Sequence, residues 1–155
     1  LEDISKLEKI NFLDQTLFVK EDIQKTFNLI KGIDDITGQV FRLYNTCFDR
    51  FPDKEGLTYW TNISQLGLIT LEDITRNFIA SNEFKDINGL NINNEDFINK
   101  LYENTFARSA DPDGFNYWNN QLDSGFISRE EVLLNISNSL ESKLYFIEST
   151  QATFI

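Results

Sequence analysis

The chain has 155 residues, a net charge of −11 from 14 basic and 25 acidic side chains, and no His. Such an acidic surface repels phosphate backbones and anionic lipid headgroups, so we expect no binding to nucleic acid or to anionic membranes. The absence of His removes the commonest general base and the commonest metal ligand.

Hydrophobic residues make up 41% of the chain and include 14 Phe, which is enough for a sizeable core. No apolar run approaches the ~20 residues of a membrane helix, so we expect a soluble protein without membrane insertion. The length fits one compact domain, or two small units packed as one. The chain begins at Leu1 and contains no Met, so we expect it to be a fragment or a processed product of a larger protein.

Residues 1–36 are predicted to form an N-terminal helical extension. It would contain roughly two helices, one in residues 1–13 (LEDISKLEKINFL) and one in residues 19–33 (VKEDIQKTFNLIKGI). In the rest of the chain we find no strand pattern that competes with helix.

The rest of the chain contains one pattern twice, at a constant offset of 58 residues and without a gap. The pattern occupies residues 48–73 and again residues 106–131. We therefore predict a first helical unit at residues 37–86, and a linker followed by a second helical unit at residues 87–155. A period of 58 exceeds that of the common helical repeats, and two copies make a poor solenoid. The expected fold is all-α, a compact multi-helix domain with pseudo-twofold internal symmetry.

The first helix of each unit is indicated by apolar residues at the spacing of one helical face. In the first unit these residues are Val40, Leu43, Tyr44, Cys47 and Phe48. In the second unit they are Phe97, Ile98, Leu101, Tyr102, Thr105 and Phe106. Thr37 and Asn94 are the expected N-caps. Cys47 is the single cysteine, and its place on this face predicts a small buried hydrophobe.

The second helix of each unit is expected to begin after Asp53 or Asp111, which would act as N-caps. Pro112 then occupies the first helical position, where its missing N–H costs nothing. Gly67 and Gly125 are expected to end these helices in the left-handed conformation.

The remaining helices also have cap signals. Capping boxes are predicted from the spacing of Thr70 with Asp73 and of Ser128 with Glu131. The last helix of each unit is expected to be capped by Ser81 or Ser139.

Two arginines, Arg50 and Arg108, end the first helices, where a cation interacts well with the exposed carbonyl groups. Glu83 and Glu141 recur at the same offset. We predict an Arg–Glu clasp that ties the ends of each unit together.

The aromatic pairs Tyr59-Trp60 and Tyr117-Trp118 have two interpretations. Large aromatic side chains at helical spacing are more often part of a core, and we predict that Trp60 and Trp118 are mostly buried. The alternative is a pair of platforms that stack against sugars.

The stretch Asp111-Pro112-Asp113-Gly114 resembles the start of a calcium loop. A helix–loop–helix calcium site needs a Glu at the twelfth loop position, where this chain has Leu122. Capping is therefore the preferred role of Asp111.

These motifs together resemble a known family. Leu-Tyr is followed after three residues by Phe-x-Arg, then by Asp-x-x-Gly-x-x-Tyr-Trp, by Gly-x-Ile-Ser/Thr and by Ser-x-Glu-Phe. The pattern is similar to an uncharacterised all-helical domain family of large secreted and surface proteins of bacteria, often found beside haemolysin-type calcium repeats. It is also similar to the phycobilisome linker domain. The matched motif positions are Arg50, Asp53, Gly56, Tyr59, Trp60, Glu83, Arg108, Asp111, Gly114, Tyr117, Trp118 and Glu141.

The resemblance implies a non-catalytic module for protein interaction or assembly in a larger secreted or cell-surface bacterial protein. Its partners would be other protein domains or surface glycans, and its location would be extracellular or on the cell surface. The alternatives are a scaffold like the phycobilisome linker, inside the cell, a carbohydrate- or calcium-binding domain, and a glycan-active enzyme domain. We expect no enzyme activity, catalytic residue, cofactor or metal ligand, because the chain has no phosphate-binding loop, no dinucleotide turn and no Cys–His pair.

Overall fold

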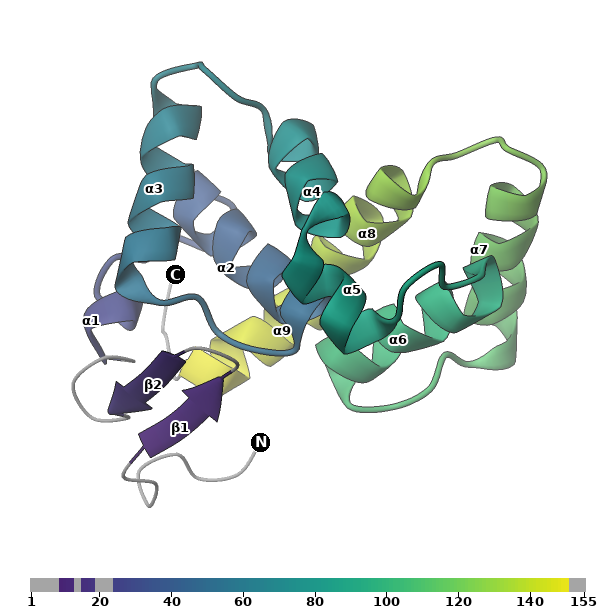
Figure 1. The fold of residues 1–155 in the computed structure, drawn as a ribbon, viewed down its shortest axis with the longest axis horizontal. Helices are drawn as coiled ribbons and strands as arrows, with labels where there is room; N and C mark the ends of the chain where they lie inside the picture. Colours follow the sequence, from purple (N-terminus) through teal and green to yellow (C-terminus); the bar gives the residue numbers. More distant parts are fainter. Residues whose placement is uncertain (1–8, 13–14, 19–23, 151–155) are drawn as a thin grey trace.

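The computed structural model describes residues 9–12, 15–18 and 24–150 (Figure 1). In chain order, the elements are β1 (Lys9–Phe12), β2 (Gln15–Phe18), α1 (Gln24–Phe27), α2 (Ile36–Phe48), α3 (Lys54–Gln65), α4 (Leu71–Ala80), α5 (Asn82–Asn88), α6 (Asn94–Phe106), α7 (Pro112–Asp123), α8 (Arg129–Ser137) and α9 (Leu140–Thr150). Every regular element between residues 24 and 150 is a helix, so the predicted all-α fold class is confirmed. None of the helices in the described ranges has the length and apolar character needed to cross a bilayer.

The N-terminal extension differs from its prediction. β1 and β2 pair antiparallel, with Ile10 opposite Leu17, so the helix expected over residues 1–13 is wrong at residues 9–12. Polar and apolar residue types alternate in the sequence KINF, and a period of two favours a strand over a helix. Of the helix expected over residues 19–33, the described residues contain only the short α1.

The chain after α1 is held in a loop by side chains of α2. The backbone N–H of Lys31 donates to Thr37 Oγ1 (2.8 Å), and Arg42 Nη1 donates to the carbonyl of Ile33 (2.6 Å). Because these side chains satisfy backbone groups that a helix would otherwise pair, the loop competes with a longer α1. The Thr37 hydroxyl therefore binds the loop and does not cap α2, so the predicted cap is wrong. The N-cap of α2 is Asp35, which accepts from the N–H of Thr37 (2.8 Å).

The N-cap of α6 is Asn93 and not Asn94. Asn93 Oδ1 accepts from the N–H of Asp96 (2.8 Å), whereas Asn94 Oδ1 accepts from Arg129 Nη2 of α8 (2.9 Å). The prediction was wrong by one residue because Asn94 joins two helices instead of capping one. The predicted caps that the structure confirms are Asp53, Thr70, Ser81, Asp111, Ser128 and Ser139, whose Oγ accepts from the N–H of Ser142 (3.1 Å).

The two helical units lie around a pseudo-twofold axis. Figure 1 shows α3 and α7 on opposite sides of the molecule, each joined by a loop at the same end to α4 or α8 in the centre. Equivalent helices meet across the axis, α2 with α6 and α4 with α8. The sequence offset and the spatial arrangement therefore describe the same duplication.

One core runs through both units. Val40, Leu43 and Ile74 are fully buried in the first unit, as are their counterparts Ile98, Leu101 and Val132 in the second. Cys47 is also fully buried, and burial raises the pKa of its thiol well above the usual range, so it acts as a small apolar side chain.

Candidate functional site

The repeated motif folds into one side-chain cluster in each unit, where the first helix meets the second. The hydroxyl of Tyr44 lies so close to Gly56 that a Cβ at this glycine would come within 2.5 Å of it. In the second unit, the hydroxyl of Tyr102 would lie 2.7 Å from a Cβ on Gly114. A glycine is therefore needed at this position because a tyrosine hydroxyl occupies the space of its side chain.

The tryptophan of the motif completes the same contact. Trp60 lies close enough to the Tyr44 hydroxyl to lower its pKa, and Trp118 acts on the pKa of Tyr102 in the same way, but in both cases burial is the larger effect. Burial raises the pKa of Tyr44 to about 12, so its hydroxyl stays protonated at neutral pH and cannot act as a base.

The predicted Arg–Glu clasp is present in both units. In the first, Arg50 Nε and Nη2 donate to the two carboxylate oxygens of Glu83 (2.6 and 3.1 Å). The Arg50 guanidinium also lies 5.1 Å from the ring centre of Tyr44. The pair joins the end of α2 to the first turn of α5, so it fixes the two ends of the unit against each other.

The clasp of the second unit is more exposed. Arg108 Nη2 donates to both oxygens of Glu141 (2.9 and 3.1 Å), and its guanidinium lies 5.4 Å from the ring centre of Tyr102. The side chains of this pair are 40% and 45% exposed, against 11% and 26% for Arg50 and Glu83. The same contact is thus expected to stabilise the first unit more than the second.

The aromatic pairs divide between core and surface. Trp60 and Trp118 are partly buried and pack on the core, with the ring of Trp60 centred 5.4 Å from that of Phe78. Tyr59 and Tyr117 are 57% and 56% exposed, so the core interpretation is wrong for the tyrosines. Adjacent residues of a helix point about 100° apart, and only one member of each pair can face the core. Each tyrosine ring instead packs edge to face against its tryptophan.

Asp111 acts as a helix cap. Its Oδ1 accepts from the N–H of Gly114 (2.9 Å), and the matched Asp53 accepts from Gly56 (2.6 Å). The bond from Gly114 is the main cause that lowers the pKa of Asp111. Within the described ranges, no group of three or more Asp, Glu, Cys or His side chains is placed to hold a metal ion.

A buried polar network joins the two units, and the sequence did not reveal it. Asn104 Nδ2 of α6 donates to the carbonyl of Thr46 in α2 (3.0 Å) and to Asn88 Oδ1 in α5 (3.0 Å). Thr105 Oγ1 donates to Thr46 Oγ1 (3.0 Å). The available signal was polar side chains at positions that face inward on an otherwise apolar helix face.

Arg42 forms a second buried link between the units. Its Nε donates to the carbonyl of Ser137 (2.9 Å) and its Nη2 to Asn138 Oδ1 (2.9 Å), both at the end of α8. Burial lowers the pKa of Arg42 to about 10, so it remains charged at neutral pH. The Nε donor satisfies one of the backbone carbonyl groups that the end of α8 leaves open.

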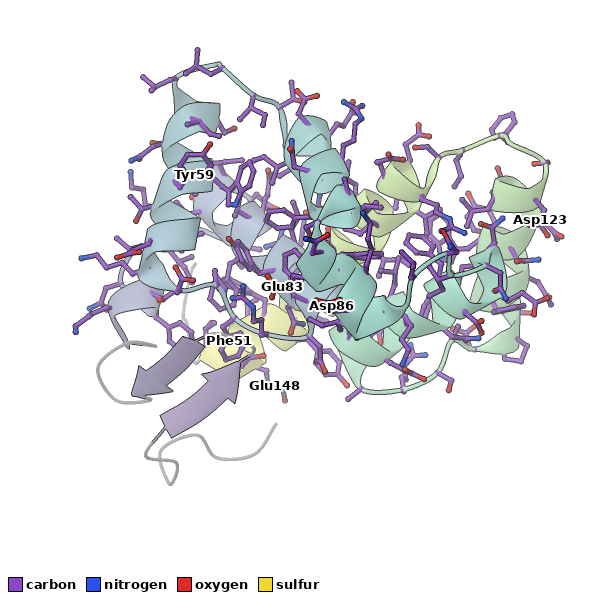
Figure 2. All side chains as sticks on the ribbon, in the orientation of Figure 1. Phe51, Tyr59, Glu83, Asp86, Asp123 and Glu148 are labelled. Carbon is purple, nitrogen blue, oxygen red and sulfur yellow. The ribbon has the colours of Figure 1, made fainter. Side chains whose placement is uncertain are left out.

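Figure 2 draws these side chains on the ribbon and labels Tyr59 on α3 and Glu83 on α5. The members of the repeated motif neutralise, cap or pack against one another within each unit. The contacts of the cluster hold the first and second helices of each unit together.

A family model described as a domain of unknown function (DUF4214) matches the chain twice, at residues 37–88 and 75–146. The first match ends with α5, and the second continues to α9. Comparison with curated proteins and with solved structures found no match.

Proposed function

The chain belongs to the family described as a domain of unknown function (DUF4214), and from this premise we propose that it is a non-catalytic interaction module of a larger secreted or cell-surface bacterial protein. The module would contact other protein domains or surface glycans through exposed apolar side chains. Its repeated motif would serve the fold, and its function would reside in what the two units present to solvent.

The observation that carries this proposal is a pair of exposed apolar tips at matched positions. Leu68 follows α3 and is 74% exposed, and Phe126 follows α7 at the same offset and is 80% exposed. Both lie directly after a left-handed glycine, Gly67 or Gly125, whose φ is 71° or 68°. Figure 1 shows both loops at the same end of the molecule.

Hydrogen bonds of the local backbone fix the conformation of the two loops that present Leu68 and Phe126. The N–H of Leu68 donates to the carbonyl of Ile63 (3.0 Å), and the N–H of Gly67 donates to that of Ser64 (2.9 Å). This double closure is the Schellman motif, and it fixes the residue after the glycine. A large apolar side chain held out in water by a fixed turn favours a partner that covers it.

A carbohydrate partner is the second candidate. The exposed ring of Tyr59 packs edge to face on Trp60, and Tyr117 does the same on Trp118. Such paired aromatic surfaces suit the apolar faces of sugars. The scaffold role suggested by the similarity to phycobilisome linkers stays a third candidate and would place the protein inside the cell.

Photo-crosslinking tests the interaction proposal. A photoreactive phenylalanine analogue is placed at Leu68 or at Phe126 in the full-length protein, in the producing bacterium. The matched controls place it at Glu55 and Asp113, which are exposed at the opposite ends of α3 and α7. We expect adducts of defined mass from both tips and none from the controls, in the secreted or surface fraction.

Adducts that are equal at tips and controls would contradict the interaction proposal, as would none at either tip. Adducts found only in the cytoplasmic fraction would favour the scaffold alternative. A glycan array separates the second candidate, because glycan binding that is lost in Tyr59→Ser and Tyr117→Ser would support a carbohydrate partner.

A further inference from the structure

A pocket of about 190 Å³ lies between the two units, at the ends of α2 and α6 and along α9. Five aromatic side chains are among the residues that line it, those of Phe41, Phe51, Phe106, Tyr145 and Phe146. Figure 2 labels Phe51 beside α9, the helix that contributes Tyr145 and Phe146. An apolar cavity of about 150 Å³ is large enough for benzene, so this pocket has room for one aromatic ring or a short branched chain.

The aromatic lining is special to one side of the pseudo-twofold axis. The equivalent hollow on the other side is lined by Asn88, Asn99 and Ser109, which stand where the pocket has Phe146, Phe41 and Phe51. The fold thus forms with polar residues at these positions. The aromatic pocket is a property of this sequence and not a requirement of the duplicated architecture.

Two carboxylates line the same pocket, those of Asp49 and Glu103. Glu103 is paired with Lys100 (3.0 Å). Asp49 is exposed, and the described residues show no side-chain hydrogen bond or ion pair for it. Desolvation is the main cause that raises the pKa of its carboxyl group, and the nearby charge of Lys100 acts against it. A carboxylate without a direct partner, next to aromatic side chains, offers a place for a cation.

The backbone does not need this carboxylate. Asp49 ends α2 in the left-handed conformation (φ 51°), and its counterpart Ala107 ends α6 in the same conformation (φ 53°). An alanine can therefore also occupy this turn. The acidic side chain at residue 49 is not required for the chain to make it.

Among the described residues, Arg42 is the one cation that lines the pocket, and it is already engaged. Arg42 donates from Nε, Nη1 and Nη2 to Ser137, Ile33 and Asn138, and it is 2% exposed. It is therefore a poor anchor for an anion, and the carboxylates at the pocket repel one.

We propose that this pocket binds a small organic cation, an ammonium or guanidinium group attached to one aromatic or branched aliphatic group. The apolar group would enter between the aromatic walls, and the charge would rest beside Asp49 and Glu103. The ligand could be a free amine or the side chains of a partner segment, since both have this chemistry. This proposal does not depend on the exposed tips, so either proposal can fail without the other.

A charge series of similar size tests the pocket. The probes are 2-phenylethylamine, 2-phenylethanol and phenylacetate, added to the ¹⁵N-labelled protein at pH 7 and followed by amide chemical shifts. We expect the amine to shift the amides of Asp49, Ala107 and Tyr145 and to bind about tenfold more tightly than the alcohol, since one charge pair near aromatic rings is worth about that factor. Phenylacetate should bind most weakly.

The variants separate the pocket from the overall charge. Asp49→Ala copies the turn made by Ala107, and Asp49→Asn keeps the shape of the side chain, so both should fold. In both variants, 2-phenylethylamine should no longer bind more tightly than 2-phenylethanol. Glu55→Gln removes one exposed charge elsewhere and should leave the advantage of the amine unchanged.

The proposal is overturned if no probe shifts the pocket amides, if the three probes bind equally, or if the amine keeps its advantage in Asp49→Ala. A second arm identifies the source of the cation. The blocked peptide Ac-Phe-Lys-NH₂, compared with Ac-Phe-Gln-NH₂, supports a partner segment if the lysine peptide binds more tightly than the amine. A weaker lysine peptide supports a free amine.

Discussion

The hydroxyl of Tyr44 occupies the space next to Gly56 that any other residue would fill with its Cβ, at a separation of 2.5 Å. Tyr102 and Gly114 repeat this relationship at 2.7 Å. The glycine and the tyrosine belong to different helices, so their contact sets how closely α2 and α3 approach. Trp60 also acts on this hydroxyl and lowers its pKa, so three positions of the motif meet at one atom.

Replacing this glycine should therefore destabilise the protein. We expect Gly56→Ala to lower the free energy of unfolding by about 1–2 kcal/mol, because overpacking costs about 1–3 kcal/mol and the better helix propensity of Ala returns only part of it. Gly32→Ala is the control, since its new Cβ would lie 3.6 Å from the nearest atom, Asp35 Cβ. Urea denaturation measures both. Combining Gly56→Ala with Tyr44→Phe removes the hydroxyl, so the cost of the alanine should shrink; an unchanged cost would refute the steric explanation.

The two Arg–Glu clasps should differ in strength. Double-mutant cycles with Arg50→Leu and Glu83→Leu should give a coupling energy of about 1–3 kcal/mol, because the pair is bidentate and partly buried. The matched cycle on Arg108 and Glu141 should give about 0.2–1 kcal/mol, because that pair is exposed. Chemical denaturation of the single and double variants measures both energies. Equal coupling in the two units would show that burial does not set the strength.

Asp111 should stabilise the protein as a cap and not as a metal ligand. Asp111→Ala removes the acceptor for the N–H of Gly114 and should lower the melting temperature by a few degrees, whereas Asp111→Asn keeps an acceptor and should change it less. Melting curves with millimolar calcium and with a chelator should coincide. A rise in melting temperature with calcium that disappears in Asp111→Asn would instead identify a calcium site.

Acid should weaken the protein through its caps. Hydrogen bonds from the backbone lower the pKa of Asp111 and Glu131 below the unfolded values of about 4. A group whose pKa is lower in the folded state stabilises it above the unfolded pKa, and this contribution is lost as the pH falls through the folded pKa. We expect the melting temperature to drop between about pH 4 and pH 2. In the double variant with Asp111→Asn and Glu131→Gln, the melting temperature should fall less over this pH range. A fall of the same size as in the wild type would show that other carboxylates cause the acid sensitivity.

The predictions from the sequence were most accurate for helix caps and turns, which depend on only a few neighbouring residues. The caps at Asp53 and Asp111 depend on donors three residues ahead, and the left-handed turns at Gly67 and Gly125 depend on one residue. The all-α class and the two units follow from periodicity and offset, which are also local or repeated signals. By contrast, Tyr59 was misassigned because the pattern of a pair does not say which member faces the core.

What the sequence could not supply depends on contacts between distant segments. Arg42 donates a hydrogen bond to Ser137 at the end of α8, 95 residues further along the chain. The residues next to Arg42 in the sequence do not indicate this partner. The loop before α2 follows from the same arginine, which explains why the helix expected over residues 19–33 stops early. The pocket beside Asp49 also needs three helices in place before it exists.

The hydrogen bond from Asn104 to the carbonyl of Thr46 joins two positions that are duplicates of each other, 58 residues apart. In a symmetric pair of identical chains, the residues that meet their own copies are those at the twofold axis. Positions 46 and 104 therefore lie near the pseudo-twofold axis of this fold. Because a single chain forms both sides of that axis, the two positions can carry different residues, and the asparagine side chain of one donates to the backbone carbonyl of the threonine at the other.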